Sequence, residues 1–476
     1  MQFNSLTFLM LFACVLAVHC LPFLSWKAKK INLLIFSYLF YTAWNPPFIV
    51  ILWFSTIVDW YAAKWIGRTD HPVKRRMGLF VTLSVNLGLL AFFKYSQFAI
   101  DNFIWAARFV GIEYKPLDID IVLPIGISFY TFQTLSYTID VYRRKAKPWN
   151  SMLDFALYVT FFPQLVAGPI VRAVDFLPQC IRPRYANSRQ FAWGINLLLL
   201  GIFQKVVIAD GLLAPIVERV YSAPVADNLS AWFGTLAFAG QIFCDFAGYS
   251  SCAIGVAMCL GFDLPDNFHF PYGAIGFSDF WRRWHITLST WLRDYLYIPL
   301  GGNQNGAVQT YRNLLVTMLI GGLWHGASWS FVVWGGLHGF YLASERWLQG
   351  THLAKWFVWR TLLGRLFLML LTFALVNVAW VFFRANSLEQ GIQLVLSMAG
   401  LSGHAVTLSP IGKFEMFICA FVVGFLLAIH WVLRDTTLEE AVNRCPMPVW
   451  VVANAIMFVS IVTMPGEDRA FIYFQF

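Results

Sequence analysis

The chain has 476 residues, of which 59% are hydrophobic and only 12% are charged, with a formal net charge of +9. Soluble domains usually carry about 25% charged residues, and the mean hydropathy here is +0.62, so the composition excludes a soluble globular protein. The basic residues lie in short clusters between apolar runs, as they do in cytoplasmic loops. The positive charge therefore does not predict nucleic-acid binding.

The apolar runs favour helices over barrel strands. Several approach the roughly 20 residues that span a bilayer as a helix. They are continuous, whereas barrel strands alternate apolar and polar residues over about ten positions. Because a helix satisfies its own backbone hydrogen bonds in lipid, the sequence predicts an all-α fold, a polytopic transmembrane helical bundle.

The first apolar run, residues 8–24, is expected to be a retained span. A secretory signal has a basic segment before its apolar part and a small-residue cleavage site after it. Here the first charged residue is Lys27, which follows the run. We see no cleavage site of that kind.

Three basic clusters predict the orientation of the early spans. They stand at residues 27–30, 68–76 and 143–147. Cytoplasmic loops carry an excess of Lys and Arg, so all three clusters are expected in the cytoplasm. The N-terminus, Asn45 with its two following prolines, and the stretch 101–120 are then expected outside.

Further spans are expected along the rest of the chain, at about 196–210, 232–260, 314–342, 363–383, 416–432 and 449–462. The apolar segment 161–184 contains four prolines, which a smooth helix does not tolerate. Irregular backbone at membrane depth needs protein or a wet cavity around it, so we expect a re-entrant or buried loop there. We predict one membrane domain with N-terminal helices (1–120), a catalytic core (121–347) and C-terminal helices (348–476).

The segment FWRRWHITLSTWLRDYLY, residues 280–297, is amphipathic on a helical wheel. Trp281, Trp284 and Trp291 share one face and the charged residues share the other, which predicts a helix at the membrane interface. Such a helix can be a simple anchor. His285 lies near the border between the faces, where a catalytic and a structural role are both open.

The segment GGLWHGASWSFVVWGGLHGFY, residues 321–341, places His325 in an apolar run between Trp324 and Trp329. A polar group there is costly unless it is partnered or used. The imidazole is expected to be neutral, and a neutral imidazole can accept a proton from a hydroxyl as a general base. The surrounding glycines allow close approach of helices or of a substrate. His338 is expected to be structural.

Other polar residues within apolar runs have ordinary explanations beside functional ones. Gln133 can serve as an interhelical hydrogen-bonder. Asp245 can orient a histidine, pair with a buried arginine, or belong to a structural ion pair. The eight cysteines show no CxxC and no zinc-like spacing, so packed free thiols and no metal are expected.

Four segments, PIGISFYTFQ, FFPQLVAGPI, DFWRRWHITLSTWLRDYLYIPLGGN and GGLWHGASWSFVVWGGLHG, together resemble the membrane-bound O-acyltransferase family. They look most like the bacterial branch that contains the alginate O-acetylation and teichoic-acid D-alanylation membrane proteins, and the C-terminal FIYFQF is similar too. The resemblance implies about a dozen helices, with re-entrant segments, around a tunnel. It implies that His325 is catalytic and that His285 is the second family histidine. Substrate contacts are expected at Trp324, Trp329, Asp245, Gln133, Arg282 and Arg283.

The function that this resemblance implies is an inner-membrane O-acyltransferase for an exported polysaccharide. The expected acetyl donor is acetyl-CoA or another acetyl thioester, which acts as a substrate. No tightly bound cofactor is expected. The chain has no G-x-S-x-G motif, which favours relay to a periplasmic acetyltransferase partner. Expected partners are that protein, the polysaccharide synthesis and export machinery, and membrane lipids. The alternatives are a transporter or flippase without chemistry, and a family member that acylates a lipid or a protein.

Overall fold

A computed structural model describes residues 3–44, 46–116, 121–223, 226–402, 409–464 and 469–472. It is 75% helical, with no strand among these residues, which confirms the all-α prediction. The predicted outer positions Asn45 and 117–120, and the last four residues of the FIYFQF motif, lie outside the described residues.

The chain divides into two compact units, and the division falls within two long helices. Unit 1 comprises residues 1–198 and 252–265, and unit 2 comprises 199–251 and 266–476. The three-part division expected from the sequence stays a prediction. The helices of unit 1 are α1 (Leu6–Cys20), α2 (Trp26–Thr42), α3 (Ile49–Arg68), α4 (Pro72–Leu90), α5 (Ser96–Phe109), α6 (Ile127–Tyr142), α7 (Met152–Thr160) and α8 (Ala173–Phe176), with the first part of α9 (Ser188–Phe203).

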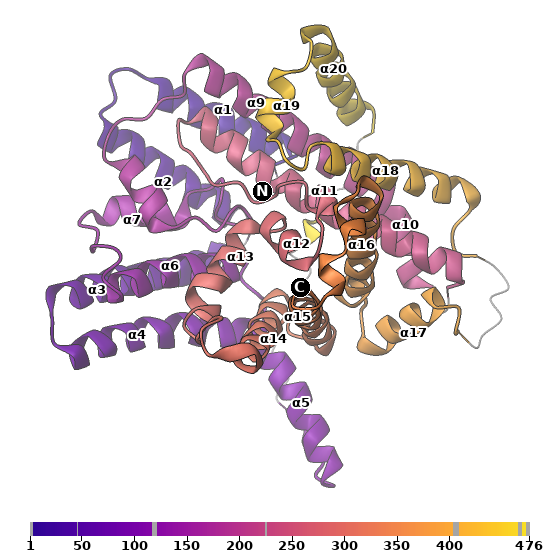
Figure 1. Ribbon diagram of the computed structural model, residues 1–476. Helices are drawn as coiled ribbons and strands as arrows, with labels where there is room; N and C mark the ends of the chain where they lie inside the picture. Colours follow the sequence, from indigo (N-terminus) through magenta and orange to yellow (C-terminus); the bar gives the residue numbers. More distant parts are fainter. Residues whose placement is uncertain are drawn as a thin grey trace. The chain divides into compact units, whose positions relative to one another are not determined.

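Polar side chains join α3 and α4, which lie side by side in unit 1 (Figure 1). Asn86 Nδ2 donates to Asp59 Oδ1 at 2.8 Å, and Ser55 Oγ donates to Asn86 Oδ1 at 2.7 Å. Thr82 also bonds to Asp59. Since all four side chains are buried, this network satisfies polar groups that lipid would leave without partners.

The second and third basic clusters meet at one end of unit 1. Arg75 donates to the carbonyl oxygens of Val141 and Tyr142, at 3.2 and 2.7 Å, and Arg144 pairs with Asp70 at 2.6 Å. These contacts bring the second and third predicted clusters together, as their common orientation requires. The compartment that they face stays a prediction.

The first half of the predicted segment 161–184 is buried without forming a regular helix, as predicted, whereas the second half contains α8 and a 3-10 helix at Leu177–Cys180 and has exposed residues. Residues 161–171 are turns and irregular backbone enclosed by unit 1. Tyr158 links this segment to α6. Its hydroxyl donates to the carbonyl oxygens of Gln133 and Val171, each at 3.1 Å. The segment therefore obtains hydrogen bonds from protein, which irregular backbone at membrane depth requires.

Unit 2 contains most of the remaining helices. They are the end of α9, α10 (Ala214–Ser222), most of α11 (Asn228–Cys259), α12 (Phe277–Arg283), α13 (Ile286–Leu292), α14 (Gly306–His325), α15 (Trp329–Gln349), α16 (Leu362–Arg384), α17 (Leu388–Met398), α18 (Lys413–Val432), α19 (Leu438–Asn443) and α20 (Met447–Thr463).

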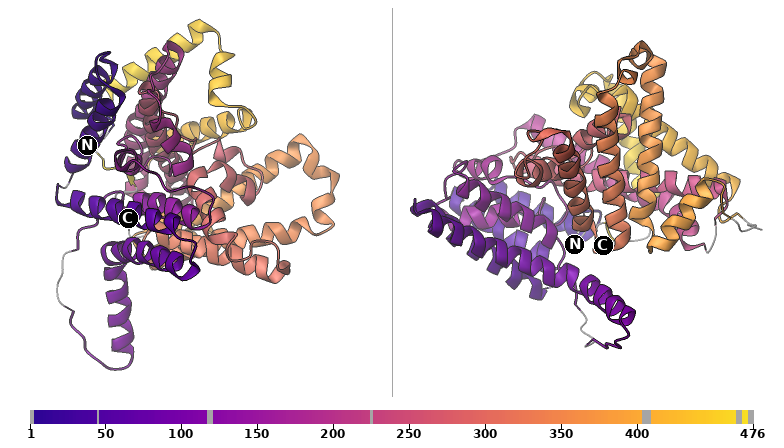
Figure 2. Two further views of the ribbon diagram at one scale, coloured as in Figure 1. Left: turned by 90° about the vertical axis from the view of Figure 1, so that its left-hand side faces the viewer. Right: turned by 60° about the horizontal axis from the view of Figure 1, so that its bottom comes forward.

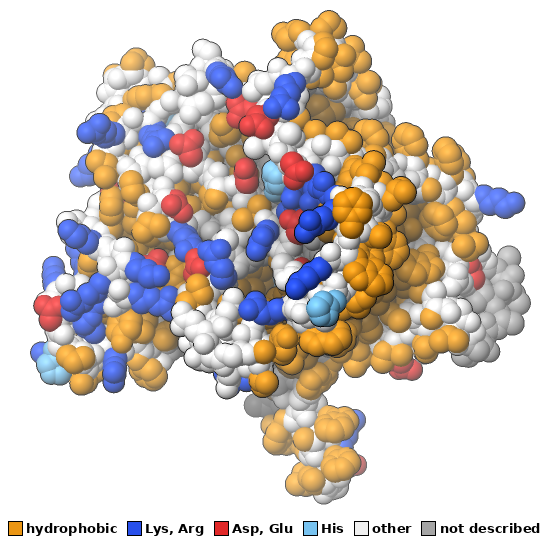
Figure 3. All heavy atoms as spheres, in the orientation of Figure 1, with side chains coloured by type: hydrophobic (Ala, Val, Ile, Leu, Met, Phe, Trp, Pro, Cys, Tyr) orange, Lys and Arg blue, Asp and Glu red, His pale blue; other side chains and the backbone are white. Residues whose placement is uncertain are grey.

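Six helices of the described chain are long and apolar enough to cross a membrane. They are Pro46–Arg68, Pro72–Phe109, Ser188–Ser222, Asn228–Cys259, Leu362–Arg384 and Lys413–Val432. The predicted spans at 196–210, 232–260, 363–383 and 416–432 are confirmed as apolar helices. Large hydrophobic side chains are exposed on α5 and α20 (Figure 3), and α5 extends away from the other helices of unit 1 (Figure 2). These surfaces suit a lipid environment, and the chain is a multi-pass membrane protein.

The predicted single span at 314–342 is wrong, because this run forms the two helices α14 and α15. They meet in a tight hairpin that depends on two glycines. A Cβ atom on Gly322 would lie 2.3 Å from the carbonyl oxygen of Phe331, and one on Gly335 would lie 2.3 Å from that of Met318. Hydropathy alone did not reveal the turn, since Gly326 and Ala327 are not strongly polar.

The amphipathic segment 280–297 is also not one continuous helix. α12 ends at Arg283, His285 takes a left-handed conformation with φ 42°, and α13 begins at Ile286. Trp284 is 1% exposed. The aromatic face thus packs inside unit 2 rather than at a membrane interface, because the break lets α12 and α13 turn their rings inward.

The basic clusters predict a labelling pattern. Single cysteines replacing the exposed residues Lys27, Lys74 and Lys145 should be protected from an impermeant thiol reagent in intact cells, because the clusters are expected in the cytoplasm. A cysteine replacing Pro47, after the opposite end of α2, should react. The native exposed cysteines are replaced by serine in all four variants. If cysteines at positions 74 or 145 were labelled from outside, the predicted orientation would be wrong.

The buried position of Trp284 predicts its contribution to stability. Trp284→Ala should lower the free energy of unfolding by about 3–5 kcal/mol, since it removes a large buried ring. Arg293→Ala is the control, because its side chain is 58% exposed and a surface ion pair is worth at most about 1 kcal/mol. Thermal unfolding in detergent measures the stability of both variants. Equal losses of stability in the two variants would be incompatible with the buried position of Trp284.

Candidate active site

Two buried histidines meet inside unit 2. The ring centroids of His285 and His325 are 6.2 Å apart, and the two side chains are 0% and 4% exposed. His285 stands between α12 and α13, while His325 is the last residue of α14. Residues 40 positions apart are therefore close enough to act on one small group.

Aromatic rings enclose this pair. The rings of Trp324 and Trp334 each lie 4.9 Å from that of His325, and Phe383 lies 5.3 Å away. Phe246 packs edge-on against His285 at 4.6 Å. The site is consequently an apolar shell around two imidazoles, in which water is scarce and electrostatic interactions are strong.

The left-handed conformation of His285 is held by its neighbours. Asn267 accepts a hydrogen bond from the backbone N–H of Ile286 at 2.9 Å and, through its side chain, one from the Thr287 hydroxyl at 2.9 Å. A left-handed non-glycine residue is strained and persists only where surrounding contacts hold it. Such strain at a buried histidine makes His285 a candidate for a functional position.

The hairpin turn places His325. α14 ends at this residue because Gly326 adopts an extended backbone with φ −159°, and α15 starts three residues later at Trp329. Trp324 lies in the aromatic shell, whereas Trp329 is 54% exposed and lies at the surface of unit 2. The predicted substrate contacts of both residues stay predictions.

Asp245 is part of a buried ion-pair cluster. Lys205 Nζ lies 2.7 Å from Asp245 Oδ1 and 3.0 Å from Asp210 Oδ1. The backbone N–H of Ile472 donates to Asp245 Oδ2 at 2.8 Å. Of the three roles considered for Asp245, the structure matches a structural ion pair, with lysine as the partner. Its predicted substrate contact stays untested.

Gln133 belongs to unit 1. Its Nε2 donates to the carbonyl oxygen of Tyr158 at 2.6 Å, which ties α6 to α7. The structure thus gives this residue the interhelical role that was one of its two interpretations. A contact between Gln133 and substrate remains a prediction.

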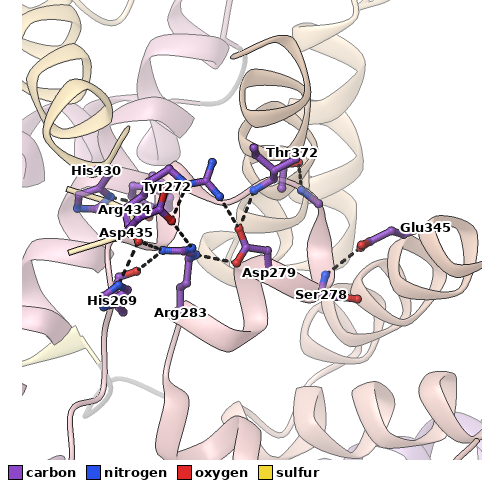
Figure 4. A network of polar contacts seen from close by, with 12 residues as sticks. His269, Tyr272, Ser278, Asp279, Arg283, Glu345, Thr372, His430, Arg434 and Asp435 are labelled. Carbon is purple, nitrogen blue, oxygen red and sulfur yellow. Dashed lines mark hydrogen bonds and ion pairs between the residues drawn. The ribbon is translucent and has the colours of Figure 1, made fainter. Parts of the chain in front are cut away.

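Arg283 is engaged in a network of polar contacts (Figure 4). Its Nε pairs with Asp279 at 2.7 Å, and its Nη1 donates to the carbonyl oxygen of Arg434 at 2.5 Å. Arg434 pairs with the other oxygen of Asp279 at 3.2 Å. Burial, followed by the nearby positive charge of Arg283, lowers the pKa of His269. Of the two predicted arginines, Arg282 is exposed and Arg283 is half-buried.

Sequence patterns did not identify several residues of the site. Phe246, Phe383 and Trp334 are ordinary aromatic residues of apolar runs, and only the fold brings them to the histidines. Asn267 is a single asparagine 18 residues before His285, and it is 1% exposed. The sequence signal for Asn267 was only that it is a polar residue following the apolar run of α11.

Comparison with known proteins identifies the family of the chain. The family model described as "MBOAT, membrane-bound O-acyltransferase family" matches residues 36–378. A probable alginate O-acetylase AlgI of Pseudomonas putida is 35% identical over 100% of both chains, and one of Pseudomonas aeruginosa is 40% identical over 93% of this chain and 83% of its own. A peptidoglycan O-acetyltransferase of Helicobacter pylori is 37% identical over 79% of this chain and 74% of its own.

The match covers both histidine motifs and most of the described helices, and it makes the chain an acyltransferase rather than a transporter without chemistry. The chain belongs to the membrane-bound O-acyltransferase family.

Proposed function

We propose that the protein moves an acetyl group from a thioester donor to a hydroxyl, for the O-acetylation of an exported polysaccharide. Relatives named alginate O-acetylase and peptidoglycan O-acetyltransferase support an acetyl group and a glycan acceptor. The observation that carries the proposal is the pair of buried histidines, His285 and His325, whose rings lie 6.2 Å apart.

His325 acts as the general base in this proposal. The attacking hydroxyl oxygen forms a bond to the thioester carbonyl carbon while its proton passes to the imidazole. The carbon–sulfur bond then breaks, and the leaving thiolate takes that proton from the imidazolium. No proton is gained or lost overall, and general-base assistance typically contributes about 10²–10⁴ in rate.

His285 has a complementary part. It lies outside the six candidate spans, and burial lowers its pKa to about 3. The ring is therefore neutral near pH 7 and offers one hydrogen-bond donor and one acceptor. We assign it the positioning of a substrate oxygen beside His325, and its strained backbone supports that assignment.

The donor and the partner complete the proposal. Acetyl-CoA, or another acetyl thioester, enters from the cytoplasm, where the exposed Arg282 can attract its negative charge. The acetyl group passes to a periplasmic acetyltransferase partner that acts with the polysaccharide synthesis and export machinery. Direct transfer to the glycan is distinguished by omitting the partner, because only direct transfer continues without it.

The central prediction concerns His325. His325→Ala should lower the transfer of labelled acetyl from acetyl-CoA by about 10²-fold or more in reconstituted vesicles that contain the cognate acceptor partner. His285→Ala should lower it as well, by a smaller factor. Alanine has good helix propensity, so the abundance of folded His325→Ala protein should stay near that of wild type.

The matched control is His352→Ala, because His352 is an exposed histidine outside the site. This variant should transfer acetyl at the wild-type rate. Wild-type transfer by well-folded His325→Ala protein would exclude His325 as the base. A wild-type protein that transfers no acetyl from the thioester would exclude the proposed donor.

A further inference from the structure

Four aromatic side chains pack together beside the histidine pair. His338 is on α15, and its ring lies 4.8 Å from that of Trp334, 5.1 Å from that of Trp281 and 6.4 Å from that of Trp380. The Trp334 indole also contacts the other two indoles, at 5.9 Å from each. We call these four residues the His338 cluster. They come from α12, α15 and α16, all within unit 2.

The nitrogen atoms of this cluster lack hydrogen-bond partners among the described residues. These atoms are both ring nitrogens of His338 and the indole nitrogens of Trp281, Trp334 and Trp380. All four side chains are more than nine-tenths buried. Native interiors leave few polar groups unsatisfied, so five such atoms on touching rings indicate a ligand that carries hydrogen-bond acceptors.

The cluster contacts the histidine pair through one residue. Trp334 packs edge-on against His325 at 4.9 Å on one side and against His338 at 4.8 Å on the other. An oxygen atom bound by the Trp334 indole would therefore lie beside the general base. The glycines at positions 322 and 335 allow the close α14–α15 approach that brings Trp334 there.

The chemistry of the donors selects the kind of oxygen. An indole nitrogen can only donate a hydrogen bond, and a neutral imidazole donates one and accepts one. Proteins usually bind a phosphate with arginine or lysine, whereas every donor of the cluster is uncharged. Uncharged donors in an apolar shell suit an oxygen that carries a partial negative charge. They stabilise it further as its negative charge increases during a reaction.

We propose that the His338 cluster is the binding subsite for the carbonyl oxygen of the acyl group, and this rests on the proposed function. The Trp334 indole N–H donates to that oxygen as the carbonyl electron pair moves onto it during hydroxyl attack. The pair returns when the carbon–sulfur bond breaks. His338 is a positioning residue that sets the orientation of Trp334, and Trp281 and Trp380 supply the remaining donors.

The first test removes one N–H and keeps the ring. Trp334→Phe should lower the turnover of labelled acetyl by about 10²-fold, the usual effect of losing one such donor, with the amount of folded protein unchanged. Trp380→Phe should act in the same direction and serves if Trp334→Phe folds poorly. The matched control is Trp232→Phe, because the Trp232 indole already donates to the carbonyl oxygen of Met398 at 2.9 Å. It should keep wild-type turnover.

The second test observes the carbonyl directly. Acetyl-CoA labelled with ¹³C at the carbonyl is bound to His325→Ala protein, and infrared difference spectroscopy records the carbonyl stretch. The band should shift to lower frequency in this background and shift less when Trp334→Phe is added. The proposed subsite would be wrong if the carbonyl band had the same frequency with and without Trp334→Phe. It would also be wrong if Trp334→Phe kept wild-type turnover. Loss of acetyl transfer by the wild-type protein would instead contradict the proposed function.

Discussion

The cost of placing imidazoles in an apolar membrane protein governs the arrangement of unit 2. Polar groups inside a membrane are expensive and are kept where they are paired or used. Here His285 and His325 are surrounded by aromatic rings, and the backbone around them is specialised to hold them. One takes a strained left-handed conformation supported by Asn267, and the other ends a helix at a glycine. The fold keeps the two histidines in an apolar centre at the expense of local regularity.

Several buried charged groups elsewhere in the described chain pair within the protein. Lys30 pairs with Asp154 in unit 1, and Lys205 pairs with Asp210 and Asp245 in unit 2. Removing one member of such a pair leaves an uncompensated charge and destabilises strongly. The nitrogens of the His338 cluster differ from these groups, because they have no partner among the described residues. That contrast is the reason to connect the cluster with a ligand rather than with stability.

The sequence predicted the elements whose signal is local and missed those that depend on tertiary contacts. Apolar runs predicted α11, α16 and α18, and the glycines and tryptophans around His325 predicted its place in an apolar site. A helical wheel could not predict the break at His285, because Asn267 and the adjoining backbone hold it from 18 residues away. Hydropathy likewise could not divide 314–342, since the turn between α14 and α15 contains no strongly polar residue.

The claim that the acetyl group crosses the membrane through this protein is tested most directly by the sidedness of transfer. Vesicles of uniform orientation would carry labelled acetyl-CoA on the side of the basic clusters and the acceptor partner on the other side. The account predicts labelled acceptor on the far side while the labelled donor stays where it was added. Label found only on the donor side, or acceptor labelled equally well in vesicles without the protein, would contradict it.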